Sequence, residues 1–317
     1  MKILIAGGAG YIGSVLIPKL LDRGYQVDVV DLLWFGNNLP PEVKVQQKDI
    51  FDLTEKDVEG YDQVIFLAGL SNDPMAEFSP AQNFISNASS PAYLAYIAKR
   101  MGVKRFIYAG SCSVYGYTVN ELYDESSPAV SNYPYGISKL QGEQAVMAMA
   151  DKDFSVIAFR QGTVSGYSPR MRLDLIVNTM FKSALLNGEI VINNPSIWRP
   201  ILGIQDAVNG YIRAVESAME ISGIFNIASG NYTVGEVADY AKEAVDKKMN
   251  KNIKLNIKNI QDFRNYKVTS EKAMNVLSFK PAHSVESILD ELVENYSRFQ
   301  DFDNPNYYNI QVFKKLY

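Results

Sequence analysis

Two side chains four residues apart could carry out acid–base chemistry on an alcohol. Tyr135 and Lys139 lie in the segment 133–139, which reads YPYGISK. On a helix this spacing puts the phenol and the ammonium on one face. A nearby positive charge lowers the pKa of a tyrosine, so the phenol could take a proton from a hydroxyl group or return it. Ser111 follows the apolar segment 105–110 and could hold the same oxygen.

A Tyr-x-x-x-Lys pair also occurs in ordinary surface helices, so its interpretation depends on the elements around it. Residues 2–6 form a short apolar run, GGAGYIG follows over 7–13, and an amphipathic stretch continues to about residue 23. This order predicts a strand, a tight turn and a helix. Gly7 would let the chain turn, Gly10 would let backbone amides approach a pyrophosphate, and Gly13 would let the helix pack closely. The start of the helix would then face the phosphates.

A second strand over 26–31 ends in Asp31. A carboxylate there can accept hydrogen bonds from both hydroxyls of an adenosine ribose and would repel a 2'-phosphate. Because no arginine follows between Asp31 and Pro41, the sequence favours NAD over NADP. The predicted cofactor-binding residues are Gly7, Gly10, Tyr11, Ile12, Asp31, Asp49, Ile50, Leu67, Ala68, Gly69, Tyr135 and Lys139.

Strands and helices alternate through the first half of the chain. Further strands are expected over 43–47, 64–69, 105–110 and 154–160, with one helix over 80–101 and another opening near residue 134. This alternation predicts the α/β class and a Rossmann doubly wound parallel sheet that binds ligands at the carboxyl ends of its strands. We expect residues 1–165 to form this NAD-binding domain, with later segments such as 199–230 returning to it.

Composition excludes several classes of protein. The 317 residues carry a net charge of -4, which gives no basic surface for nucleic acid. A single cysteine and a single histidine permit neither an internal disulfide nor a Cys/His metal site, which fits a cytoplasmic protein. The apolar stretch at the start is too short for a membrane span, so we expect no membrane partner.

Taken together, these motifs resemble the extended short-chain dehydrogenase/reductase family, which includes nucleotide-sugar epimerases, dehydratases and ketoreductases. The resemblance covers nearly the whole chain. It implies that Ser111 and Tyr135 are catalytic and that Lys139 lowers the pKa of the tyrosine and binds the nicotinamide ribose. It also implies that Ser113 is a second contact to the sugar, and that the protein is a homodimer formed through the helices around 92–98 and 145–150.

The second half, 166–317, then reads mainly as a smaller α/β lobe for a nucleotide sugar. Residues 168–178 (SPRMRLDLIVN) resemble a subgroup that includes enzymes oxidising C4 of a GDP-heptose, which implies that Arg172 and Asn178 meet the substrate. Arg199 and Arg264 resemble the family arginines that bind the nucleotide diphosphate, although each could also be a surface arginine. The aromatic tail 301–317 matches nothing in the family and could cover the active site or form an oligomer contact.

Departures from the family narrow the reaction. Sugar 4,6-dehydratases carry an Asp-Glu pair where this chain has Cys112 and Ser113. On a strand Cys112 would point away from the position of the cysteine base in 3,5-epimerases, so we expect a small buried residue there. The remaining reactions are hydride transfers at C4. NAD favours a 4-epimerase or 4-dehydrogenase over an NAD(P)H-dependent 4-keto-sugar reductase, and the complete Ser-Tyr-Lys set argues against a non-catalytic NAD-binding regulatory protein.

Overall fold

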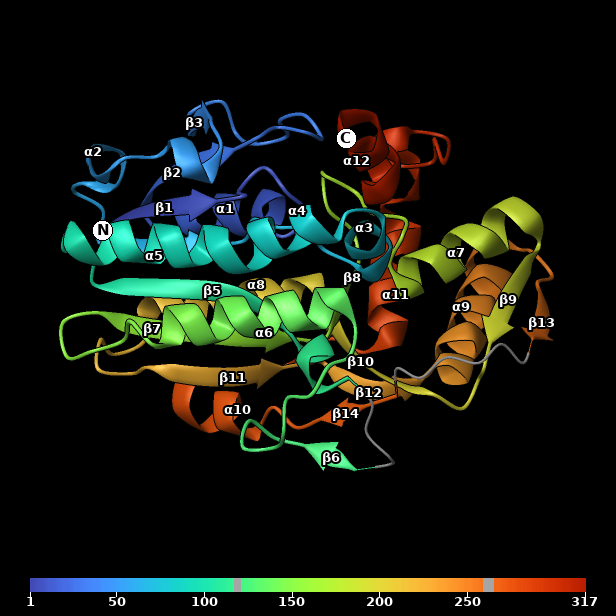
Figure 1. Cartoon of the computed structure of the whole chain (residues 1–317). Coiled ribbons are helices and arrows are strands. Elements are labelled where there is room, and N and C mark those ends of the chain that lie inside the picture. The colour runs from blue at the N-terminus through green and yellow to red at the C-terminus, as the bar shows by residue number, and fades with distance from the viewer. Residues whose placement is uncertain (117–120, 259–264) are drawn as a thin grey trace.

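The computed structural model describes residues 1–116, 121–258 and 265–317. Its centre is a seven-stranded parallel sheet in the order β11-β7-β5-β4-β1-β2-β3 (Figure 1). The bounds of these strands are β1 Lys2–Ala6, β2 Gln26–Asp31, β3 Lys44–Gln47, β4 Gln63–Phe66, β5 Arg105–Ser111, β7 Ser155–Gln161 and β11 Gly223–Ile227. The predicted α/β class and doubly wound parallel sheet are therefore confirmed.

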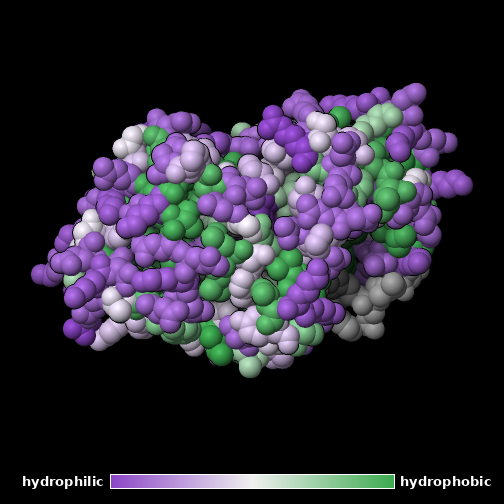
Figure 2. Space-filling model, turned by 90° about the horizontal axis from the view of Figure 1, so that it is seen from above, coloured by the Kyte–Doolittle hydropathy of each residue, from purple (hydrophilic) through white to green (hydrophobic). Residues whose placement is uncertain are grey.

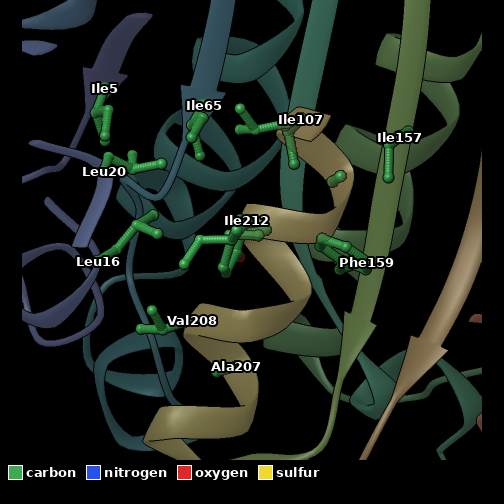
Figure 3. Close-up of a cluster of buried hydrophobic side chains, with 14 of the residues drawn as sticks. Ile5, Leu16, Leu20, Ile65, Ile107, Ile157, Phe159, Ala207, Val208 and Ile212 are labelled. Atoms are coloured by element: carbon green, nitrogen blue, oxygen red, sulfur yellow. The ribbon is translucent and has the colours of Figure 1, made fainter. Parts of the chain in front are cut away.

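Helices cover both faces of this sheet because its strands are apolar on both sides. Helices α5 (Ser90–Arg100) and α6 (Pro134–Met147) lie on one face, and α1 (Gly13–Leu21) and α8 (Ile204–Glu216) lie on the other (Figure 1). Figure 3 shows the second face, where side chains of α1 and α8 pack on those of β1, β4, β5 and β7. The labelled residues are Ile5, Leu16, Leu20, Ile65, Ile107, Ile157, Phe159, Ala207, Val208 and Ile212.

The expectation of one helix over 80–101 is wrong in detail. The segment divides into α4 (Pro80–Phe84), a π-helical turn at Ile85–Ser89, and α5. Proline at 91 has no N–H to donate into the preceding turn. The carbonyl of Asn87 accepts a hydrogen bond from the Tyr108 hydroxyl at 3.1 Å instead. The extra residue in the π turn buries the Asn87 side chain, whose amide donates to the Leu70 carbonyl at 2.9 Å.

The second half of the chain builds its own core beside the carboxyl ends of the strands. Three smaller sheets accompany it: β12-β10-β8, β13-β9 and β14-β6. The remaining elements are α2 Glu55–Val58, α3 Asp73–Phe78, β6 Leu122–Tyr123, β8 Thr163–Ser165, α7 Ile176–Asn187, β9 Glu189–Asn193, β10 Trp198–Gly203, β12 Gly230–Thr233, α9 Val234–Met249, β13 Lys254–Lys258, β14 Lys267–Val268, α10 Glu271–Leu277, α11 Val285–Glu294 and α12 Asn309–Leu316. The domain boundary at residue 165 remains a prediction.

A buried ion pair fastens α6 to the sheet. Arg160 on β7 donates to both carboxylate oxygens of Glu143 on α6, at 2.8 and 2.7 Å, and also to the Tyr115 hydroxyl at 2.9 Å. The two charged side chains are 5% and 1% exposed, so neither charge is shared with water. Breaking such a pair leaves one charge buried without a partner, which is strongly destabilising.

We expect Arg160→Met to lower the free energy of unfolding by about 3–5 kcal/mol, because it leaves the Glu143 carboxylate buried and unpaired. Denaturant unfolding followed by circular dichroism measures this change. Adding Glu143→Leu should recover much of the loss. As a matched control, Lys247→Met, which removes the exposed i,i+4 pair with Glu243, should cost less than about 1 kcal/mol. A loss of that small size for Arg160→Met would contradict the assignment.

Candidate active site

A cavity of about 740 Å³ lies at the carboxyl ends of the central strands, between the sheet and the second half of the chain. Figure 2 shows the molecule from above, with hydrophobic side chains gathered in a band between two largely hydrophilic parts. All twelve predicted cofactor-binding residues line the cavity, as do Ser111, Ser113, Arg172 and Arg199. These predicted residues thus meet in one place, although they come from distant segments of the chain.

The glycine turn after β1 is built to receive a dinucleotide. Gly7 has φ +75, and a Cβ atom there would lie 2.5 Å from the backbone nitrogen of Ala68. At Gly13 a Cβ atom would lie 2.1 Å from the Gly8 carbonyl oxygen, so the helix could not begin so close to the turn with a larger residue. The backbone at Gly10, Tyr11 and Ile12 borders the cavity at the start of α1, where N–H groups and the helix dipole favour phosphate. These residues fit a dinucleotide diphosphate.

Asp31 lines the end of the cavity where we expect the adenosine ribose to bind. Its carboxylate accepts hydrogen bonds from the backbone N–H of Ala9 at 3.0 Å and of Leu33 at 2.8 Å, which fix its orientation. Burial raises its pKa, while the two amides and the Arg170 charge act in the opposite direction. Asp49 and Ile50 line the same region, and Asp49 caps its own turn by accepting from the Phe51 N–H at 2.9 Å.

The three predicted catalytic residues converge at the end of β5. The Ser111 hydroxyl hydrogen-bonds the Tyr135 phenol and lowers its pKa, and it also pairs with the Ser113 hydroxyl at 2.5 Å. Tyr135 and Lys139 lie on α6, and the Lys139 ammonium donates to the Ala109 carbonyl at 3.0 Å. Gly69, with φ +127, leaves room for the Asn87 side chain beside this pair, because a Cβ atom there would lie 2.3 Å from the Asn87 Oδ1.

Burial controls the charges of this pair. It raises the pKa of Tyr135 to about 12, and the Ser111 hydrogen bond offsets only part of that rise. Burial also lowers the pKa of Lys139 from 10.5 to about 8. The sequence predicted that Lys139 would bring the tyrosine pKa towards neutrality. Within the protein, the groups that lower the pKa of Tyr135 are Ser111 and Arg172. Lys139 is not one of them, because its ammonium is directed at the Ala109 carbonyl.

Arg172 lines the cavity on the far side of Tyr135 and is locked in place. Its guanidinium donates twice to the Asp174 carboxylate, at 2.9 and 3.1 Å, and Asp174 also accepts from the Asn72 amide at 3.0 Å. Asp73 lies close enough for its charge to raise the pKa of Tyr135. The sugar end of the cavity therefore offers carboxylate, amide and guanidinium groups together.

The other predicted substrate residues differ in position. Asn178 is fully buried and does not line the cavity: its amide donates to the Arg172 carbonyl at 2.8 Å and its oxygen accepts from the Gly166 N–H at 3.0 Å. It positions the neighbouring loop rather than facing a ligand. Arg199 lines the cavity at its opposite end and lies over the Tyr266 ring. Arg264 falls outside the described residues.

Cys112 is buried, as expected, but for a different reason. Residues 112–115 form a 3-10 turn rather than a continuing strand. The thiol is 1% exposed and lies 3.2 Å from the Arg160 carbonyl oxygen, so burial raises its pKa. A thiol in this environment stays protonated and is unsuited to act as a base.

Sequence reasoning missed a group of residues at the adenosine end of the cavity. Trp34, Phe35, Arg170 and Asn309 all line it. Asn309 opens α12, so the aromatic tail covers the cavity, which was one of the two expectations for it. No periodicity links these four positions, which come from three separate segments of the chain, so the sequence carries no signal that would bring them together.

These features define a dinucleotide-dependent enzyme with a Ser-Tyr-Lys site. The model of the NAD dependent epimerase/dehydratase family matches residues 3–228, and the chain belongs to this family. It is therefore an NAD-dependent enzyme.

Relatives span most of the chain. The UDP-glucose 4-epimerase of Lactobacillus helveticus is 27% identical over 312 residues, covering 89% of this chain and 93% of the relative. UDP-glucuronic acid decarboxylase 1 of Arabidopsis thaliana is 26% identical, covering 93% and 70%. The crystal structure of UDP-glucose 4-epimerase from Thermotoga maritima with UDP-glucose has a TM-score of 0.84 at 26% identity, covering 95% of this chain and 100% of that one.

Two further findings concern the described part of the chain. None of its helices is both long and apolar enough to cross a membrane. Within the same residues, no group of three or more histidine, cysteine, aspartate or glutamate side chains is arranged to hold a metal ion.

We expect the contribution of Lys139 to stability to depend on pH. Below pH 8 Lys139 is protonated in the folded protein, and burying its charge lowers the free energy of unfolding by the full amount. Between its folded pKa of about 8 and its ordinary pKa of 10.5, the unfolded state binds more protons than the folded state. The free energy of unfolding therefore rises with pH in this window. The unfolding free energy of the wild type should therefore rise, relative to that of Lys139→Met, by up to about 3 kcal/mol across this window. Denaturant unfolding at a series of pH values measures it, with the exposed Lys152→Met as control. A difference that does not change with pH would contradict the burial argument.

Proposed function

We propose that this protein acts on a nucleotide sugar by hydride transfer at C4 of the sugar, as a 4-epimerase or 4-dehydrogenase. The observation that carries the proposal is the convergence of Ser111, Tyr135 and Lys139 beside the dinucleotide cradle in one cavity. The activities of the relatives, which include UDP-glucose 4-epimerases and UDP-glucuronic acid decarboxylases, support a nucleotide-sugar substrate.

The chain's own residues divide the work. Ser111 holds the reacting sugar oxygen, and Tyr135 takes its proton and later returns it. Lys139, anchored on the Ala109 carbonyl, presents its ammonium between the tyrosine helix and the cofactor groove. NAD supplies the hydride acceptor, and the positive charge of its nicotinamide stabilises phenolate. That charge is needed because burial keeps the pKa of Tyr135 at about 12 even with the opposing effects of Ser111 and Arg172.

The neighbours of Ser111 favour hydride transfer without elimination of water. The Ser113 hydroxyl forms a hydrogen bond with the Ser111 hydroxyl, and the Cys112 thiol is buried against the Arg160 carbonyl. The Asp174 carboxylate is paired with Arg172, which reduces its basicity. Arg199 would bind the nucleotide diphosphate at the other end of the cavity, and family resemblance gives Arg264 the same role. We further propose a cytoplasmic homodimer that pairs through α5 and α6, two helices that pack side by side.

We expect Tyr135→Phe to lower turnover by about 10²- to 10⁴-fold, because the variant cannot transfer the proton. The assay follows absorbance of reduced cofactor and identifies products across a panel of UDP-, GDP- and dTDP-sugars. Tyr240→Phe, on α9 and outside both the cavity and the proposed dimer helices, is the matched control.

The products separate the candidate reactions. A 4-epimerase yields the C4-inverted sugar with the cofactor oxidised at the end, whereas a 4-dehydrogenase yields a keto sugar with one reduced cofactor for each turnover. Consumption of reduced cofactor by a 4-keto sugar identifies the reductase alternative. If wild type and Tyr135→Phe behave alike across the panel, the catalytic proposal fails.

A further inference from the structure

A buried arginine at the end of the cavity that contains Asp31 has no salt-bridge partner among the described residues. Arg170 lies in the β8–α7 loop (residues 166–175), lines the cavity and is 3% exposed. One terminal nitrogen donates to the Asn309 side-chain oxygen at 2.5 Å and the other makes a long contact of 3.4 Å with the Met171 carbonyl. Its Nε atom is buried with no hydrogen-bond partner. In the described part of the chain no carboxylate lies within salt-bridge distance of it.

A charge in this position is expensive unless something compensates it. Burial, with the neighbouring charge of Arg172 as a smaller cause, lowers the pKa of Arg170 to about 9. The guanidinium still remains protonated at neutral pH. A cation kept inside a cavity, with an unpaired N–H group and no carboxylate of the described residues within salt-bridge distance, is suited to an anionic ligand.

The position of Arg170 identifies which anion is in reach. Two residues earlier, the Ser168 hydroxyl donates to the Tyr11 carbonyl at 2.8 Å, which fixes the β8–α7 loop against the glycine turn. On its other side the guanidinium lies on the Phe35 ring, 3.6 Å from its centroid, and near enough to Asp31 for the two charges to interact. Arg170 thus lies between the turn that receives the diphosphate and the carboxylate that receives the ribose.

The C-terminal helix holds this arginine in place. The Asn309 side chain bridges Arg170 and the Ser71 hydroxyl, to which its amide donates at 2.6 Å. Further along α12, Phe313 is fully buried against Leu70 and Met75, and its ring lies 5.7 Å from that of Trp34. Figure 1 shows α12 above the carboxyl ends of the strands, close to α3. Helix α12 therefore contacts both the segment after β2 and the segment after β4 at this end of the cavity.

We propose that Arg170, held by Asn309, binds the diphosphate of NAD, so that α12 forms part of the cofactor site. This assignment rests on NAD as the cofactor and is independent of the sugar carbon that reacts. It is tested by binding alone, with no sugar present, so its failure is distinct from a failure of the proposed reaction.

The test measures dissociation constants for NAD, NADP, ADP and adenosine by calorimetry, with quenching of tryptophan fluorescence as a second readout because Trp34 lines the site. Arg170→Met should weaken NAD and ADP binding by about 10- to 100-fold, the range for a lost hydrogen bond to a charged group, and change adenosine binding by less than about twofold. Arg298→Met is the matched control, since Arg298 is exposed and also lies over an aromatic ring, that of Tyr167.

A second variant keeps the proposal testable if Arg170→Met folds poorly. Asn309→Asp places a carboxylate beside the guanidinium, which preserves the contact but neutralises the charge, and should weaken NAD and ADP binding in the same direction. Unchanged affinities in both variants overturn the proposal. Equal losses for ADP and adenosine would show that Arg170 acts through packing, and a loss confined to NADP would assign it to a 2'-phosphate; either result overturns it as well.

Discussion

One buried ion pair fixes α6 to the sheet, and two of the three proposed catalytic residues lie on α6. Glu143 lies four residues after Lys139 and eight after Tyr135, so all three side chains share one helix face. Arg160 fixes that face to β7 with two short hydrogen bonds, while the Tyr108 hydroxyl contacts the Lys139 carbonyl from β5. Two charges inside the protein do little for net stability compared with apolar packing, but their geometry is specific. We infer that the pair is retained because it sets where the helix lies.

The same constraint explains why burial controls the charges of the site. A helix held tightly on a sheet leaves no water beneath it, so the phenol and the ammonium both favour their neutral forms. The protein supplies a hydroxyl at Ser111 and the charge of Arg172 to offset this for Tyr135. The arrangement is therefore poised to respond to a further charge that enters the cavity with the cofactor.

The sequence predicted the parts of the site that local rules determine. Gly7 and Asp31 follow strands whose apolar pattern is plain, and the spacing of Tyr135 and Lys139 follows from helical geometry. The π turn at 85–89 was not predicted, because its cause is a tertiary contact between Asn87 and Tyr108. Asn178 was assigned to the substrate by resemblance, but the structure uses its amide to hold the loop. Arg170 and Asn309 are 139 residues apart, and nothing short of the folded chain brings them together.

The length of the β8–α7 loop fixes the positions of two arginines at once. Arg170 at one end of this loop lies beside the glycine turn, and Arg172 two positions later lies beside Tyr135 at the sugar end. An insertion or deletion between them would shift both contacts at once. With Arg170 and Arg172 in their proposed roles, substitutions that keep the length of the loop could change sugar preference alone, whereas a change of length would also disturb the proposed contact with the nucleotide cofactor.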